Sequence, residues 1–205
     1  MRVLWFNIIL AIGCLAFANV RAGDFGNIVG TDGVPSRFKA EVNNFMLKQF
    51  NLSLKYLLTG VAYGSQQVQR NGMAKYLREL SDQHWSQGID FLKKYFARSG
   101  RINDVFFNFN GKNEIHLVPT NDMRIPYIET LEDLHKDSGE VISILNKLHK
   151  ISDKHDDFHD ADWAHFFEER AEKEVERVRQ LKGFITTLEK MSNSSLALHV
   201  FDSHI

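Results

Sequence analysis

The sequence from residue 160 to residue 191 reads DADWAHFFEERAEKEVERVRQLKGFITTLEKM. Its apolar residues recur three, four or seven positions apart, at Trp163, Phe167, Ala171, Val178, Leu181, Ile185 and Leu188. This is the period of an α-helix with one apolar face. The stretch therefore predicts a long helix, about 40 Å in length, whose apolar stripe must pack against other helices.

Three other stretches show the same period, over about residues 36–65, 71–99 and from Pro126 to about 151, and a short fifth segment covers about 196–201. The links before the second and the fourth long helix are short, so each joins antiparallel neighbours. The link from Gly100 to Ile125 is long enough to travel the length of a bundle. The sequence predicts an all-α four-helix bundle with one long crossover and a short fifth C-terminal helix.

The composition excludes several classes of protein. Apolar residues make up 43% of the 205 residues, which is enough for a packed core and too many for global disorder. The net charge of −1 disfavours a nucleic-acid-binding protein, which should be basic. The one cysteine, Cys14, excludes a disulfide framework and a zinc-finger or iron–sulfur site built by this chain alone.

The first 22 residues read MRVLWFNIILAIGCLAFANVRA. A positively charged start, an apolar run over residues 3–18 and small residues before Gly23 are typical of a secretory signal peptide. The alternative is a membrane anchor, but the run is shorter than the roughly 20 residues that a spanning helix needs. We expect a signal peptide at 1–22, an N-terminal extension at 23–35 and a helical-bundle domain at 36–205. The mature chain is expected in the secretory pathway or outside the cell, with no membrane segment.

Several short strings resemble the ferritin family in their order and spacing. They are Met73-Ala74-Lys75-Tyr76, Leu148-His149-Lys150, Leu188-Glu189-Lys190-Met191 and Phe201-Asp202-Ser203-His204. The resemblance extends over about residues 38–204. The string Ser81-Asp82-Gln83-His84-Trp85 and the signal peptide are similar to secreted light-chain-like ferritins of insects. The resemblance implies a ferritin-like bundle that stores iron as a ferric (Fe3+) mineral.

The same resemblance places the degenerate counterparts of a di-iron ferroxidase site on six residues. They are Gln49, Tyr56, His84, Gln87, Ser138 and Glu174. A ferroxidase subunit would carry Glu, Glu-x-x-His and Glu where this chain has Gln49, His84-x-x-Gln87 and Ser138. Iron ions in such sites want carboxylate oxygens, so we expect a hydrogen-bonded polar layer, no catalytic cofactor and no enzyme activity. A subunit with residual ferroxidase activity is the alternative.

The resemblance also suggests two sets of residues that contact iron outside this layer. Glu79 and Asp82 are candidates for mineral nucleation, and Asp162 and His165 are candidates for the lining of an iron-entry channel. Each set has an ordinary structural alternative. Glu79 can pair with Lys75 four residues before it, and the acidic turn before residue 161 can cap a helix. No residue is assigned to a resident metal ion.

The resemblance implies a secreted, non-catalytic ferritin subunit. It would join ferritin heavy-chain-like subunits in a twenty-four-subunit hetero-oligomer, a hollow shell that takes up iron ions for storage and transport. The rival from another class is a secreted helical-bundle signalling protein. That class predicts two long crossovers and usually disulfides, whereas this sequence indicates one long crossover and has a single cysteine.

The signal-peptide interpretation predicts where the mature protein begins. Protein secreted from cultured cells should start at or near Gly23 and contain no disulfide, because cleavage removes Cys14. N-terminal sequencing combined with intact-mass measurement checks both points. Retention of Met1 in the secreted protein would show that residues 1–22 are not a cleaved signal.

Overall fold

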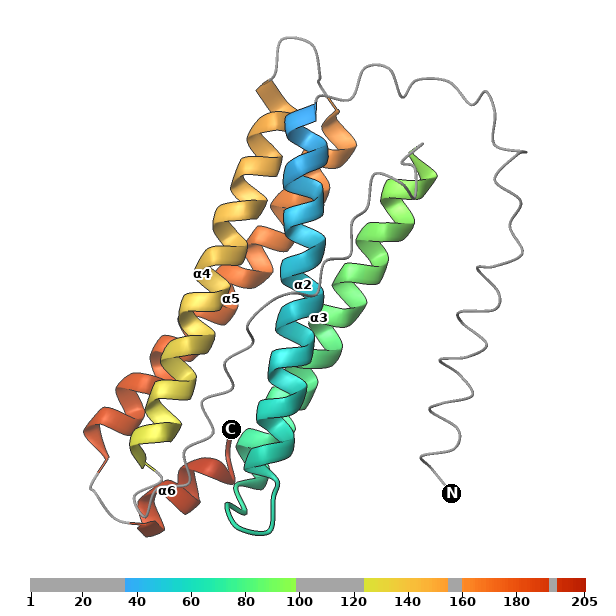
Figure 1. The fold of residues 1–205 in the computed structure, drawn as a ribbon. Helices are drawn as coiled ribbons and strands as arrows, with labels where there is room; N and C mark the ends of the chain where they lie inside the picture. The colour runs from blue at the N-terminus through green and yellow to red at the C-terminus, as the bar shows by residue number, and fades with distance from the viewer. Residues whose placement is uncertain (1–35, 99–123, 155–159, 192–194) are drawn as a thin grey trace, which may run out of the picture. The chain divides into compact units, whose positions relative to one another are not determined.

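Helices carry nearly all of the residues that the computed structural model describes, which are 36–98, 124–154, 160–191 and 195–205. The helices are α2 (Ser36–Tyr63), α3 (Asn71–Ala97), α4 (Arg124–Lys154), α5 (Ala161–Lys190) and α6 (Ser195–Asp202) (Figure 1). These bounds confirm the predicted four long helices and short terminal helix to within a few residues. The proposed signal peptide and the extension at 23–35 lie outside the described residues and stay predictions.

The four long helices form two antiparallel pairs. Helix α2 packs along α3, α4 packs along α5, and α2 also contacts α4. In Figure 1, α3 ends at one end of the bundle and α4 begins at the opposite end. The chain must therefore travel the bundle length once between these helices, as predicted, although residues 99–123 themselves lie outside the described part. None of the described helices combines the length and the apolar character that a bilayer-spanning helix needs.

Local chemistry explains where the helices begin. Helix α4 begins two residues before Pro126, earlier than the sequence predicted. Proline is tolerated there because the first-turn N–H groups of a helix have no intrahelical partner. Helix α5 begins after Asp160, whose Oδ1 accepts hydrogen bonds from the backbone N–H groups of Asp162 and Trp163 at 3.1 and 3.2 Å. The helix-capping use of an acid in this turn is thereby confirmed for Asp160.

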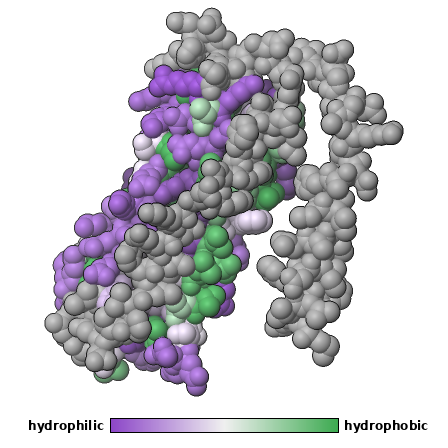
Figure 2. Space-filling model, viewed as in Figure 1, coloured by the Kyte–Doolittle hydropathy of each residue, from purple (hydrophilic) through white to green (hydrophobic). Residues whose placement is uncertain are grey.

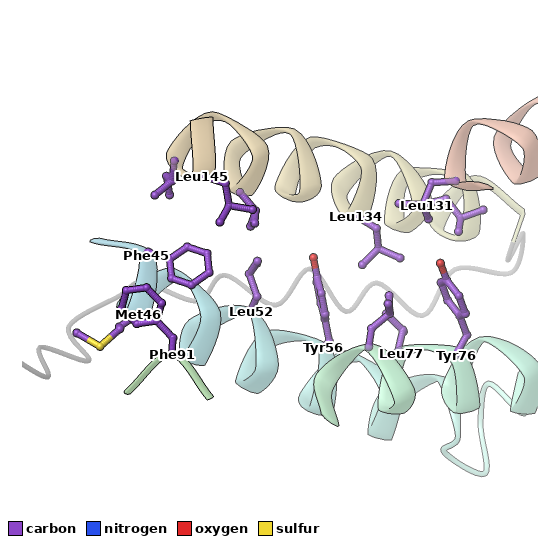
Figure 3. Close-up of a cluster of buried hydrophobic side chains, with 14 of the residues drawn as sticks. Phe45, Met46, Leu52, Tyr56, Tyr76, Leu77, Phe91, Leu131, Leu134 and Leu145 are labelled. Atoms are coloured by element: carbon purple, nitrogen blue, oxygen red, sulfur yellow. The ribbon is translucent and has the colours of Figure 1, made fainter. Parts of the chain in front are cut away.

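The core divides into an aromatic part and an aliphatic part. In the aromatic part, rings from three helices are in contact: Phe45 and Phe91 have ring centroids 5.0 Å apart, and Trp163 stacks on Phe167 at 5.3 Å. In the aliphatic part, leucines of α4 such as Leu134 face the side chains of α2 and α3 (Figure 3). Burial of these side chains supplies the main driving force that holds the four stripes together.

One carboxylate of helix α6 bonds to two long helices. Asp202 Oδ2 and Oδ1 accept hydrogen bonds from the backbone N–H groups of Gly72 and Met73, each at 3.0 Å, so Asp202 caps the start of α3. Tyr127 of α4 donates its hydroxyl to Oδ1 at 2.9 Å. A Cβ atom on Gly72 would lie 1.6 Å from the Asp202 carbonyl oxygen, so only glycine permits this approach. Asp202 thus joins α3, α4 and α6.

Replacement of Asp202 by alanine should destabilise the bundle. The substitution removes a helix cap and leaves the buried Tyr127 hydroxyl without its acceptor, so the free energy of unfolding should fall by about 2 kcal/mol. Urea denaturation followed by circular dichroism measures this change. Asp133→Ala, at an exposed position of α4, is the control and should change stability little. Equal stability of the two variants would mean that the Asp202 cap contributes nothing.

Candidate functional site

A layer of polar side chains crosses the centre of the bundle. Each long helix contributes one member: Gln49 from α2, His84 from α3, Ser138 from α4 and Glu174 from α5, each at most 2% exposed. The apolar stripes of the four helices meet here, so each of these side chains points inward. Five of the six positions singled out in the sequence are buried in the bundle, and these four of them form the layer.

The hydrogen bonds of His84 define which of its ring nitrogens carries the proton. His84 Nδ1 lies 2.7 Å from Gln49 Oε1. An amide oxygen only accepts, so Nδ1 donates and Nε2 of the neutral ring keeps a free lone pair. Arg177 of α5 donates from Nη1 to this Nε2 at 3.3 Å. The imidazole is thus held between an acceptor and a cation.

Arg177 also neutralises the one carboxylate of the layer. Its Nη1 lies 2.6 Å from Glu174 Oε1, and its Nη2 donates to Gln83 Oε1 at 2.8 Å. Glu174 is buried, and the Arg177 side chain is only 10% exposed. A buried charge is tolerated only when an opposite charge and hydrogen bonds compensate it. One guanidinium therefore donates hydrogen bonds to His84, Glu174 and the surface residue Gln83.

Burial and Arg177 shift the pKa values of this layer. Burial, together with the positive charges of Arg177 and Lys48, lowers the pKa of His84 to about 3. Burial raises the pKa of Glu174, while Arg177 and the nearby Ser138 act in the opposite direction. His84 is therefore neutral at physiological pH, with Nε2 unprotonated.

Tyr56 and Gln87 do not join this hydrogen-bonded layer. The Tyr56 hydroxyl points toward α4 (Figure 3) and donates to Asp137 Oδ2 at 3.3 Å. Lys55 also donates to this oxygen, at 2.6 Å, so Asp137 holds its own network beside the layer. The Tyr56 ring meets the His84 ring edge-on, with centroids 5.4 Å apart. Gln87 is half-buried, and no hydrogen bond links it to the layer within the described residues.

Sequence reasoning missed Arg177 and Asp137. A signal for Arg177 was present, because it follows Glu174 by three residues and so lies on the same side of α5. A buried carboxylate needs a cation, and Arg177 is the basic residue at helical spacing after it. Asp137 directly precedes Ser138, and its burial depends on Lys48 and Lys55 of α2, which the sequence alone does not pair with it.

The remaining candidates lie at the surface. Asp162 forms ion pairs with Lys94 at 2.7 Å and Arg98 at 2.5 Å, and hydrogen bonds from these residues lower the pKa of Asp162 to about 2. Its charge is thus compensated within the chain, whereas His165 is exposed. Glu79 and Asp82 are exposed on α3, and Glu79 lies 3.8 Å from Lys75, as the structural alternative predicts.

Comparisons with known proteins agree with this architecture. The model of the ferritin-like domain family matches residues 39–191 of the chain. The ferritin light chain of Trichoplusia ni is 24% identical over 186 residues, which cover 87% of this chain and 79% of that protein. The ferritin light chain of Drosophila melanogaster is 23% identical over 184 residues, covering 86% and 77%. The crystal structure of Trichoplusia ni secreted ferritin has a TM-score of 0.70 at 23% identity, over 95% of this chain and 94% of that chain.

Four long helices, one bundle-length connection and a short terminal helix define a ferritin-like bundle protein. Because the family model covers residues 39–191, the chain belongs to the ferritin family. Over most of its length it is a distant homologue of the insect ferritin light chains.

A pair of catalytic iron ions does not fit the polar layer of this chain. Such a pair needs several carboxylates and a histidine projecting inward from the helices. The layer offers one carboxylate and one imidazole, and Arg177 contacts both. Among the described residues, no group of three or more His, Cys, Asp or Glu side chains could hold a metal ion.

The buried, neutral His84 should make the protein sensitive to acid. Below pH about 6.5 the unfolded chain binds a proton at this histidine, whereas the native ring stays neutral. The free energy of unfolding should therefore fall as the pH falls, by about 2 kcal/mol between pH 7 and pH 5 for this residue alone. The raised pKa of Glu174 has the opposite effect on the free energy of unfolding. The native carboxyl takes up a proton more readily than the unfolded one, so this group stabilises the folded protein as the pH falls.

The comparison of His84→Asn with His165→Asn isolates this effect. Asparagine at position 84 can still donate to Gln49 but does not titrate, so the stability of that variant should vary less with pH. His165 is exposed, and its replacement should leave the acid sensitivity unchanged. Guanidinium chloride unfolding at several pH values measures the difference. Parallel pH profiles for the wild type and His84→Asn would contradict the assignment.

Proposed function

We propose that this chain is a secreted, light-type ferritin subunit that stores ferric iron in a shell shared with ferroxidase-bearing subunits. The observation that carries the proposal is the state of the polar layer. Its only carboxylate, Glu174, is neutralised by Arg177, so this layer offers no free carboxylate to an iron ion. A storage role then requires a heavy-chain-like partner to oxidise Fe(II). The insect light-chain relatives support the same role.

An exposed apolar stripe on α2 supports assembly with other subunits. Leu54, Leu57, Leu58 and Val61 recur at helical spacing, and each is 40% to 59% exposed. Figure 2 shows a hydrophobic surface along the lower half of α2. Large exposed apolar patches mark sites of protein association. We propose that this stripe contacts a neighbouring subunit of the twenty-four-subunit hetero-oligomer.

The residues proposed to contact iron differ in how available their charges are. Glu79 and Asp82 lie on an exposed face of α3, so they are the better candidates for mineral nucleation. Asp162 remains a candidate for the channel lining together with His165, but Lys94 and Arg98 compensate its charge. A channel attracts cations through negative charges that no neighbouring cation compensates. In this proposal iron is cargo and not a resident cofactor.

The rival signalling protein fits the structure less well. A bundle of that class has two long crossovers. Here α2 ends at Tyr63 and α3 begins at Asn71, and the turn between them is closed by a hydrogen bond from Arg70 N–H to the Tyr63 carbonyl at 2.9 Å. The link between α4 and α5 is closed in the same way, by a hydrogen bond from Asp160 N–H to the Ser152 carbonyl at 2.9 Å. Of the connections between the four long helices, only the one between α3 and α4 is then left to cross the bundle.

Co-expression with an insect ferritin heavy subunit tests the proposal. Native mass spectrometry should find both chains in one shell, and the shells should retain iron after aerobic Fe(II) loading. Preparations of this chain alone should consume oxygen with Fe(II) no faster than buffer. Rapid, saturable oxygen uptake by this chain alone would contradict the proposal and favour a residual ferroxidase.

A pair of variants tests the role of the stripe in the same experiment. Leu57→Glu combined with Leu58→Glu should leave the bundle folded but reduce its incorporation into shells at least about tenfold, because charges would be buried in the contact. Lys147→Glu, at an exposed polar position of α4, is the control and should be incorporated normally. Normal incorporation of the stripe variant would show that the contact lies elsewhere.

A further inference from the structure

The centre of the bundle contains a cation that belongs to the chain itself. A single nitrogen atom, Nη1 of Arg177, lies 3.3 Å from His84 Nε2 and 2.6 Å from Glu174 Oε1. Histidine nitrogen and carboxylate oxygen are the donors in the layer that bind transition metals best. Nη1 therefore lies between the two groups that a divalent ion would share.

We propose that Arg177 closes the bundle centre to divalent metal ions, and that His84 and Glu174 form a metal-binding pair as soon as the guanidinium is removed. This inference concerns the bundle interior and does not depend on iron storage. If a folded Arg177→Ala variant bound Co2+ no more tightly than the wild type, the inference would fail and the proposed function would stand. Failure of co-assembly or of iron retention would refute the proposed function and leave the inference intact.

The first argument is that His84 is already arranged as a metal ligand. Its Nδ1 donates to Gln49 Oε1, so the lone pair of Nε2 is directed at Arg177. Metal-binding histidines have the same arrangement, since the nitrogen that does not bind the metal donates to an oxygen acceptor that orients the ring.

The second argument is that Glu174 has unused capacity as a ligand. Oε1 accepts from Arg177, while the buried Oε2 accepts no hydrogen bond from the residues that the structure describes. A buried oxygen without a partner is costly, and a metal ion that bound both oxygens would remove that cost. Ser138 lies beside this carboxylate and adds a hydroxyl oxygen. The pair would thus suit a borderline ion such as Zn2+ or Co2+, with water completing the coordination.

The third argument is that Arg177 excludes a metal both by charge and by position. A divalent ion next to a guanidinium in a buried site is strongly repelled. The same side chain extends to the surface, where Nη2 is bonded to Gln83 of α3. Gln83 lies four residues after Glu79 and next to Asp82, so removal of Arg177 would open the layer toward the exposed surface of α3 that carries these two carboxylates.

The test uses the full mature chain and Co2+ as the probe. Arg177→Ala removes the guanidinium, and Arg179→Ala is the matched control, because Arg179 is exposed two residues further along α5. Arg177→Ala should bind Co2+ at least about tenfold more tightly than the wild type, the smaller of the changes typical for groups that control a metal site. Binding should produce visible absorption of Co2+ and raise the thermal midpoint of this variant. The wild type and Arg179→Ala should show neither change.

Two further measurements separate metal exclusion from a merely structural role of Arg177. Millimolar guanidinium ion should raise the thermal midpoint of Arg177→Ala and compete with Co2+, because both cations would occupy the same space. The double variant Arg177→Ala, His84→Ala should lose the Co2+ absorption. If Arg177→Ala does not fold either with or without Co2+, the Co2+ titration is repeated with Arg177→Gln, whose amide can still donate to Glu174.

Three results would overturn the proposal. The first is that the wild type binds Co2+ as tightly as Arg177→Ala does, and that this binding requires His84. The second is a folded Arg177→Ala or Arg177→Gln variant that binds Co2+ no more tightly than the wild type. The third is Co2+ absorption that persists unchanged in the double variant, since the metal would then be bound elsewhere.

Discussion

The bundle interior depends on one buried charge pair, Arg177 with Glu174. Four polar side chains meet where the apolar stripes of four helices would otherwise pack, and burying them without partners would cost several kcal/mol. Arg177 neutralises Glu174, donates to His84 and reaches Gln83 at the surface, and His84 in turn donates to Gln49. The hydrogen bonds of Glu174, His84 and Gln49 thus form one network that includes the Arg177 guanidinium. The same arrangement leaves the layer with a single carboxylate, whose charge Arg177 compensates.

A second carboxylate determines how the short terminal helix is held. Asp202 caps α3 and accepts from Tyr127 of α4, so the last turn of α6 is joined to two long helices at one end of the bundle. Gly72 permits this close approach because it has no Cβ. Asp202 joins groups from three helices directly. Arg177 joins α5 to α3, and the hydrogen bond from His84 to Gln49 extends this network to α2.

Much of the fold followed from helical periodicity, because apolar residues at steps of three and four define both a helix and its buried face. The ends of the helices were less predictable: α4 begins before Pro126, a position where the missing N–H of proline costs nothing. For the candidate site, the resemblance to ferritins identified Gln49, His84, Ser138 and Glu174, and the structure buries all four. The partners were harder to predict. Arg177 could have been found from its spacing to Glu174, whereas the pairing of Asp137 with Lys48 and Lys55 depends on how α4 packs on α2.

The central claim is that iron chemistry in a mixed shell takes place outside the bundle of this chain. Anomalous diffraction at the iron edge, from crystals of the co-assembled shell loaded aerobically with Fe(II), measures where the iron lies. We predict iron peaks inside the bundles of the heavy subunits and no peak between His84 and Glu174, where the Arg177 guanidinium should be visible in the density. An iron peak at that position, with Arg177 displaced, would contradict the account.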